Sequence, residues 1–148
     1  MKRLLIALLV LIALLVIIQY LPKNKETKPS VTINGKVFEV FLAKTNQEKE
    51  KGLSIYSSLS LNKGMVFIYQ YPDYYAFWMK DMKFPIDIIY INKNKIVDVF
   101  KNVPAPKRLN EKLPIIKPGE KSDTILEINA GLSDKYNFKT GDFVKINY

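Results

Sequence analysis

Two acidic residues stand within otherwise apolar stretches that have the length of β-strands. Asp87 interrupts the run Ile86–Ile91, and Glu127 interrupts the run Thr124–Asn129. A buried carboxylate is costly unless it is paired or hydrogen-bonded, so each of these residues needs a reason to be there. Two carboxyl groups whose environments push their pKa values apart can serve as a general acid and a general base. Asp87 and Glu127 are therefore the first candidates for chemistry in this chain.

The alternation of side chains along a strand groups further polar residues with these two. Successive side chains point to opposite faces, so Glu127 shares a face with Asn129, and Trp78 shares one with Lys80. If the strands are neighbours in the fold, these side chains converge. The predicted pocket consists of Trp78, Lys80, Asp87, Glu127 and Asn129.

Three roles are open for this group. In a structural role, Lys80 forms an ion pair with Asp87 or Glu127, or the carboxylates accept hydrogen bonds from loop amides. Removing one partner of such a buried pair costs about 3–5 kcal/mol. In a binding role, the residues line a small polar pocket. In a catalytic role, Asp87 and Glu127 act as the acid/base pair of a hydrolase, and catalytic residues stay unassigned until geometry distinguishes these roles.

A second set of candidates is aromatic. Tyr71, Tyr74 and Tyr75 flank Pro72-Asp73 in an expected loop, where they would reach the surface. Each offers an apolar ring with a polar tip, which suits stacking on a sugar or on a partner protein. A structural or assembly function would depend on these surface tyrosines.

Composition excludes several classes of function. The 148 residues include no His and no Cys, which removes His general bases, Cys nucleophiles, Cys/His zinc sites and haem ligation by these residues. The sequence also lacks a phosphate-binding glycine loop, a dinucleotide fingerprint and a calcium-binding loop. We therefore predict neither a metal site nor a cofactor.

The net charge of +9 does not indicate nucleic-acid binding. Almost half of it lies in residues 1–28, and the remainder is dispersed over the following 120 or so residues. Such a dispersed excess suits proximity to anionic lipid or to an acidic envelope polymer better than it suits a nucleic acid.

The N-terminal residues have the character of a membrane segment. Leu4–Leu21 is an 18-residue run whose only polar side chains are Gln19 and Tyr20, and as a helix it would be about 27 Å long. Lys2 and Arg3 precede it, as in an export signal, but no small-x-small cleavage site follows. We predict a single-pass signal anchor over residues 1–21 of a cell-membrane protein, with the C-terminal domain outside the cytoplasm.

The remainder divides into a tether and one domain. Residues 22–30 (PKNKETKPS) are polar and rich in Lys, which is typical of a solvated linker. In the domain, residues 31–148, Asn34-Gly35 favours a tight hairpin, and Thr45 with Glu48 forms a capping box that predicts a short helix ending near Gly52. Strands are predicted at Val31–Ile33, Lys36–Ala43, Met65–Tyr69, Ala76–Met79, Ile86–Ile91, Ile96–Phe100, Thr124–Asn129 and Phe143–Ile146.

These elements predict a mainly β fold. Residues 102–120 contain Pro104, Pro106, Pro114 and Pro118 and form a long irregular connection, and Leu132–Tyr136 predicts a second helical turn. Short strands at regular spacing with little helix indicate an antiparallel sandwich or a partly open barrel with one or two short helices.

The order of several short motifs resembles the DUF192 family. The motifs are Gly52-Leu53, Gly64-Met65-Val66-Phe67, Phe77-Trp78-Met79-Lys80-Asp81, Pro85-Ile86-Asp87-Ile88-Ile89, Leu126-Glu127-Ile128-Asn129-Ala130-Gly131 and Gly141-Asp142-Phe143-Val144. The resemblance covers residues 31–147 and implies a compact, mainly β domain without an established activity. It also implies that Lys80, Asp87, Glu127 and Asn129 are recurrent polar positions, whereas Ser54 replaces the usual Met.

Three functions follow as hypotheses. The first is a membrane-anchored extracytoplasmic module that binds an envelope glycan, a small molecule or a protein. The second is an envelope hydrolase that uses Asp87 and Glu127, and the third is a structural or assembly protein.

Overall fold

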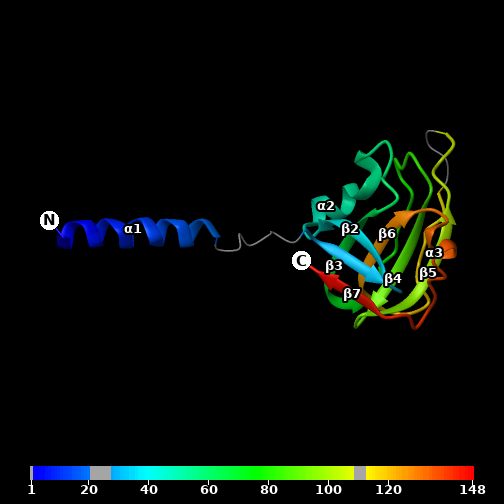
Figure 1. Ribbon diagram of the computed structural model, residues 1–148. Coiled ribbons are helices and arrows are strands. Elements are labelled where there is room, and N and C mark those ends of the chain that lie inside the picture. Colours follow the sequence, from blue (N-terminus) through cyan, green and yellow to red (C-terminus); the bar gives the residue numbers. More distant parts are fainter. Residues whose placement is uncertain (1, 21–27, 109–112) are drawn as a thin grey trace.

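The computed structural model describes residues 2–20, 28–108 and 113–148. Within them, helix α1 (Lys2–Tyr20) is followed by a β domain that begins at strand β1 (Figure 1). In this part of the chain, no helix combines the length and the apolar character that a membrane crossing requires. Leu21 and residues 22–27 of the predicted anchor and tether lie outside the described residues.

Seven strands form one mixed sheet with the order β5-β4-β6-β3-β2-β1-β7. The strands are β1 (Ser30–Ile33), β2 (Lys36–Ala43), β3 (Lys63–Asp73), β4 (Ile86–Asn92), β5 (Lys95–Val103), β6 (Ser122–Asn129) and β7 (Val144–Asn147). All neighbouring pairs are antiparallel except β2 and β3, which are parallel. The predicted mainly β class is therefore confirmed, with one parallel pairing in place of an all-antiparallel sheet.

Two tight turns set the hairpins of this sheet. Asn34 and Gly35 have φ values of 48° and 77°, the left-handed conformations that a two-residue hairpin with the native strand twist requires. Lys93 and Asn94 connect β4 to β5 with φ values of 48° and 62°. The predicted Asn-Gly hairpin is confirmed.

The sheet curls until its two edge strands approach each other at one end. The Ile96 amide donates to the Asp142 carbonyl at 3.0 Å, and the Val144 amide donates to the Asn94 carbonyl at 2.8 Å. Lys95 and Phe143 form an isolated antiparallel bridge at the same place. Of the two predicted architectures, the partly open barrel is the one observed (Figure 1).

Both faces of the sheet are buried, each in its own apolar cluster. The inner cluster includes Val31, Phe38, Ile89, Leu126 and Phe138. The outer cluster includes Leu53, Phe67, Met79, Tyr90 and Ile125. The outer face is buried because the segments between β2 and β3, between β3 and β4, and between β5 and β6 pack over it.

Three short helical elements complete the domain: α2 (Asn46–Lys51), the 3₁₀ turn η1 (Gly52–Ile55) and α3 (Leu132–Lys135). Helix α2 begins with the predicted capping box, because the Glu48 amide donates to Thr45 Oγ1 at 3.2 Å and the Thr45 amide donates to Glu48 Oε2 at 2.8 Å. The prediction of one or two short helices in the domain is confirmed.

The strand predicted at Ala76–Met79 does not form. Only Phe77 makes a bridge there, with Ile116 of the proline-rich connection: each residue's amide donates to the other's carbonyl, at 2.8 and 2.7 Å. Phe77 and Met79 pack against the outer cluster because the segment lies over the outer face of the sheet, not because it joins the sheet, and Ala76 and Trp78 are exposed. Apolar alternation alone cannot distinguish these two arrangements.

Candidate functional site

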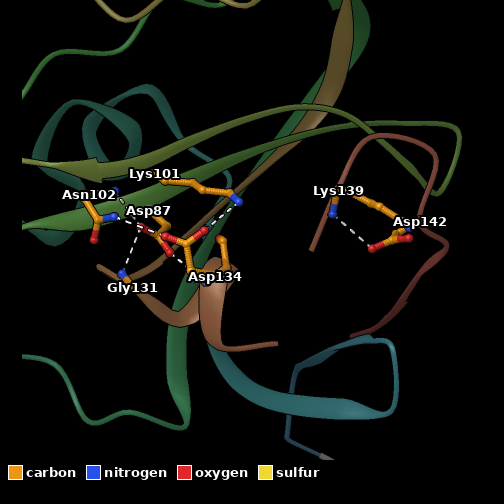
Figure 2. Close-up of polar contacts among 8 residues, drawn as sticks. Asp87, Lys101, Asn102, Gly131, Asp134, Lys139 and Asp142 are labelled. Atoms are coloured by element: carbon orange, nitrogen blue, oxygen red, sulfur yellow. Dashed lines mark hydrogen bonds and ion pairs between the residues drawn. The ribbon is translucent and has the colours of Figure 1, made fainter. Parts of the chain in front are cut away.

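Asp87 is fully buried, and within the described residues its hydrogen-bond partners are backbone amides (Figure 2). Its Oδ1 accepts hydrogen bonds from the amides of Asn102, at 2.7 Å, and Gly131, at 3.1 Å. Its Oδ2 accepts from the amide of Ser133 at 2.7 Å. Three charge-assisted hydrogen bonds satisfy the carboxylate without any cation.

These bonds join three segments that are far apart in the sequence. Asn102 lies in β5 with a φ of 54°, Gly131 precedes α3 with a φ of 82°, and Ser133 lies in the first turn of α3. Asp87 therefore holds two left-handed residues and a short helix against β4. This is one of the structural alternatives that the sequence left open, a carboxylate that accepts from loop amides.

Glu127 lies on the opposite face of the sheet from Asp87. In the β4–β6 pairing, Asp87 is opposite Ile128 of the inner cluster, whereas Glu127 is opposite Ile88 of the outer cluster. The sheet therefore separates the two carboxyl groups. The predicted convergence of Asp87 with Glu127 is wrong, because the register places them on different sides of the backbone.

The Glu127 side chain is buried without compensation. The residue is 5% exposed, and its Oε2 atom has no hydrogen-bond partner among the residues that the structure describes. Burial disfavours the charged form and raises the pKa of the Glu127 carboxyl to about 8 from its ordinary value of 4.5. At neutral pH this carboxyl is mainly protonated, so it can donate a hydrogen bond as well as accept one.

A cavity of about 40 Å³ lies above this carboxyl. Residues of the α2–η1 segment, of β3, of β6 and of the segment between β3 and β4 surround it. They are Lys49, Glu50, Lys51, Gly52, Leu53, Ser54, Phe67, Phe77, Trp78, Lys80, Met82 and Glu127. Among these, Gly52, Leu53, Phe67 and Met82 are buried, Lys49 is half-buried, and Glu50, Lys51, Trp78 and Lys80 are exposed to solvent.

Two glycines let the backbone approach Glu127 closely. Gly52 has a φ of 48°, and a Cβ there would lie 3.3 Å from Phe67 Cζ and 4.0 Å from Glu127 Oε2. A Cβ at Gly64 would lie only 2.8 Å from the Glu127 carbonyl oxygen, which no real side chain permits. The site therefore requires glycine both at the start of η1 and in β3 beside Glu127.

The structure brings three of the five predicted pocket residues together. Trp78, Lys80 and Glu127 line the cavity, with Trp78 55% exposed and Lys80 Nζ lying 5.2 Å from the centre of the Trp78 ring. Asp87 is on the other face, as described. Asn129 is occupied elsewhere, because its Nδ2 donates to the carbonyls of Leu59, at 2.9 Å, and Ser60, at 3.2 Å.

The predicted ion pairs of Lys80 do not form. Among the described residues, the ion pairs are Lys28–Glu39, Lys63–Glu39 and Lys101–Asp134. Lys101 and Asp134 are joined at 2.7 Å beside the Asp87 cluster, which adds to the attachment of α3 (Figure 2). Lys80 instead lies over an aromatic ring at the opening of the cavity.

The three surface tyrosines have different environments. Tyr71 and Tyr74 are 68% and 44% exposed, as a surface role requires. Tyr75 is half-buried: its ring stacks on Tyr69 with 3.5 Å between ring centres, and its hydroxyl donates to the Tyr71 carbonyl at 2.8 Å. Tyr75 therefore serves the packing of the outer face.

Sequence reasoning missed the residues of α2 that surround the cavity. Lys49, Lys51 and Gly52 belong to the helix that the capping box predicted, and the family motif Gly52-Leu53 marked its end. The signal was a glycine with positive φ directly after a short helix that carries two lysines and two glutamates. Within the described residues, no group of three or more acidic side chains could hold a metal ion.

The fold and the site together define a class: a small, partly open β-barrel domain with one uncompensated carboxyl group beneath a surface cavity. The profile of the DUF192 family, described as "Uncharacterized ACR", matches residues 29–146. The chain belongs to this family.

Two solved structures resemble the chain. One is a protein of unknown function from Novosphingobium aromaticivorans, which is 31% identical, with a TM-score of 0.68 over 79% of this chain and 82% of that one. The other is described as a "putative transcription regulator" from Sinorhizobium meliloti and has a TM-score of 0.68. It is 24% identical over 82% of this chain and 98% of that one, a likeness that shows the fold alone. No curated protein matches the chain significantly.

Proposed function

We propose that this protein is a membrane-anchored domain of the cell envelope that binds a small ligand in the cavity above Glu127. The ligand would contact Glu127 at the base of the cavity and Trp78 and Lys80 at its opening. The anchoring and the location rest on the sequence, and the binding role rests on the contacts of Glu127.

The observation that carries the binding role is the unpaired Oε2 atom of Glu127. A buried polar atom without a partner costs about 1–3 kcal/mol. Four such atoms occur among the described residues, and Glu127 Oε2 is the one whose residue lines this cavity. A ligand in the adjoining cavity would supply the missing hydrogen bond. The perturbed pKa of the carboxyl is a second feature that is typical of functional sites.

The hydrolase hypothesis has less support, because it needs two carboxyl groups at one bond. Asp87 is on the other face of the sheet, and its two oxygens are occupied by three amides. Glu50 is the other carboxylate at the cavity, and it is exposed at the opening. The single buried carboxyl at the cavity therefore supports a binding site better than an acid/base pair, which would need a second carboxyl group at the same place.

The assembly hypothesis keeps one specific observation in its favour. The exposed Tyr74 ring has two lysines over it, with Lys117 Nζ 5.6 Å and Lys121 Nζ 5.9 Å from the ring centre. An aromatic ring flanked by cations is a common recognition feature at protein surfaces. Replacement of Tyr74 provides the test of this second candidate.

The anchor is proposed from the run Leu4–Leu21, whose length suits a bilayer. Cell fractionation tests it: the full chain should remain with membranes after an alkaline carbonate wash, and a chain lacking residues 1–21 should be released. Release of the full chain by carbonate would contradict the anchor. Protease treatment of spheroplasts tests the outward orientation, which predicts cleavage of the domain without permeabilisation.

The binding role is tested by thermal shift of the full chain in detergent against sugars, sugar acids, phosphates, amines and amino acids. At least one class should raise the melting temperature, and Glu127→Leu should abolish that shift. Tyr71→Ser, remote from the cavity lining, is the matched control and should keep the shift. If no class gives a shift, or if Glu127→Leu retains it, the cavity is not a binding site.

A further inference from the structure

The opening of the Glu127 cavity is basic. Lys49 and Lys51 of α2 and Lys80 of the segment between β3 and β4 stand around it. None of the ion pairs in the described part of the chain involves these lysines. Lys49 Nζ lies 3.9 Å from the centre of the Tyr69 ring, and Lys80 Nζ lies 5.2 Å from that of Trp78, so aromatic faces hold both ammonium groups without neutralising them.

The base of the cavity complements this charge. Glu127 supplies a buried carboxyl whose Oε2 has no partner, and burial keeps it mainly protonated at neutral pH, with a pKa of about 8. A protonated carboxyl can donate to an oxyanion, whereas an ionised one would repel it. The base is therefore a neutral donor beneath an opening where three lysines outnumber the single glutamate, Glu50, which is an environment for an anionic oxygen.

The size of the cavity limits what can enter. At about 40 Å³, it has room for about three water-sized groups. A carboxylate, with three non-hydrogen atoms, fits this space, whereas a sugar ring does not. The remainder of a ligand must lie outside, against the opening.

Trp78 offers the surface for that remainder. Its side chain lines the cavity and is 55% exposed, although Trp side chains are highly buried on average. An indole face suits the apolar face of a sugar ring, and Glu50 and Ser54 at the same opening can accept hydrogen bonds from hydroxyl groups.

From these contacts we propose that the cavity binds an acidic sugar, with its carboxylate at Glu127 and its ring against Trp78. This inference rests on the proposed binding function and names the ligand class for the same site. Lys80 and the lysines of α2 attract and hold the carboxylate, and the protonated carboxyl of Glu127 donates a hydrogen bond to one of its oxygens. Uronic acids, free or at the end of a polymer, have this chemistry.

Binding should depend on pH, because only protonated Glu127 donates. The charged and titratable groups facing the site come from α2, from β3, from β4 and from the segment between β3 and β4. They are Lys49, Glu50, Lys51, Tyr69, Tyr90 and Lys80. Burial raises the pKa of Tyr69 to about 12 and raises that of Tyr90 as well, so neither changes charge near pH 8.

The test is isothermal titration of the full chain in detergent with D-glucuronate, D-glucose, acetate and inorganic phosphate. Glucuronate should bind at least tenfold more tightly than each of the other three. Lys80 is exposed, so Lys80→Gln should leave the fold intact, and it should weaken the binding of glucuronate at least fivefold. Affinity should fall toward tenfold per pH unit above pH 8. Glu127→Leu should abolish binding, and Lys145→Gln, an exposed lysine of β7 far from the cavity lining, is the control.

Several results would overturn the inference. If glucose binds as tightly as glucuronate, the site does not recognise the carboxylate. If acetate or phosphate binds as tightly as glucuronate, the site does not recognise the sugar ring. If an amine or a neutral compound binds in a Glu127-dependent way instead, the proposal of an acidic sugar is wrong, but the proposed binding function stands. If no compound of any class binds in a Glu127-dependent way, both fail.

Discussion

The two faces of the β4–β6 pair handle a buried carboxyl group in opposite ways. On the inner face, Asp87 receives three amide hydrogen bonds of 2.7 to 3.1 Å. On the outer face, Glu127 keeps an oxygen without any partner. The two residues lie on adjacent strands, and both are at most 5% exposed.

The difference lies in what the surrounding backbone offers. Around Asp87, the chain turns through Asn102 and Gly131 so that amide groups point at the carboxylate. Around Glu127, no donor of the described residues reaches the Oε2 atom, although lysines stand among the residues that line the cavity. Burial by itself therefore does not identify a structural carboxylate, because only donors that satisfy it make it one.

The largest effect is expected from removing the satisfied carboxylate. Asp87→Ala leaves one buried and two part-buried amides without their acceptor, and we expect a loss of about 3–5 kcal/mol in the free energy of unfolding. Urea denaturation of the full chain in detergent measures it. Glu50→Gln, at an exposed carboxylate, is the control and should stay within about 0.5 kcal/mol. An Asp87→Ala protein as stable as the control would show that the inner cluster does not hold α3 and β5.

The opposite sign is expected at Glu127. Glu127→Met replaces an uncompensated carboxyl by an apolar side chain of similar length, and it should raise the free energy of unfolding by about 1–3 kcal/mol. The same variant should lose ligand binding. Denaturation and the thermal-shift screen measure the two effects. A loss of stability comparable to that of Asp87→Ala would mean that Glu127 is structural.

The pH dependence of stability sharpens the comparison further. Glu127 has a pKa of about 8 in the folded state and about 4.5 in the unfolded state, so between these values only the folded chain keeps the proton. Its contribution is fully present below pH 4.5 and decreases by about 1.4 kcal/mol per pH unit between the two pKa values, until about pH 8. The difference between wild type and Glu127→Gln over pH 5–8 isolates this slope. A difference that does not change with pH would contradict the raised pKa.

The smallest effect is expected at the exposed tyrosines. Tyr71→Ser and Tyr74→Ser should change the free energy of unfolding by less than about 0.5 kcal/mol. Tyr75→Ser, by contrast, loses a stacked ring and a hydrogen bond and serves as the matched comparison. Co-purification from membranes distinguishes the functions: loss of a specific partner with Tyr74→Ser but not with Glu127→Leu would favour the assembly protein.

Local chemistry in the sequence was enough for several elements. The left-handed Asn34-Gly35 pair, the Thr45 capping box and the alternation of β6 each led to the element that forms. The strand prediction for Ala76–Met79 was wrong, because Phe77 and Met79 pack onto the sheet from outside and the segment does not join it. A residue that covers a sheet and a residue within it show the same hydrophobicity, so the pattern could not separate them.

The sequence by itself determined that Asp87 and Glu127 would be buried in strands, and which side chains of each strand share a face with them. Only the tertiary structure decided that they face opposite ways. Side-chain alternation has a period of two, so it relates residues within a strand but leaves the relation between strands to register, and a shift of one residue exchanges the faces. The β4–β6 register, which places Glu127 opposite Ile88, is what separates the satisfied carboxylate from the one left at the cavity.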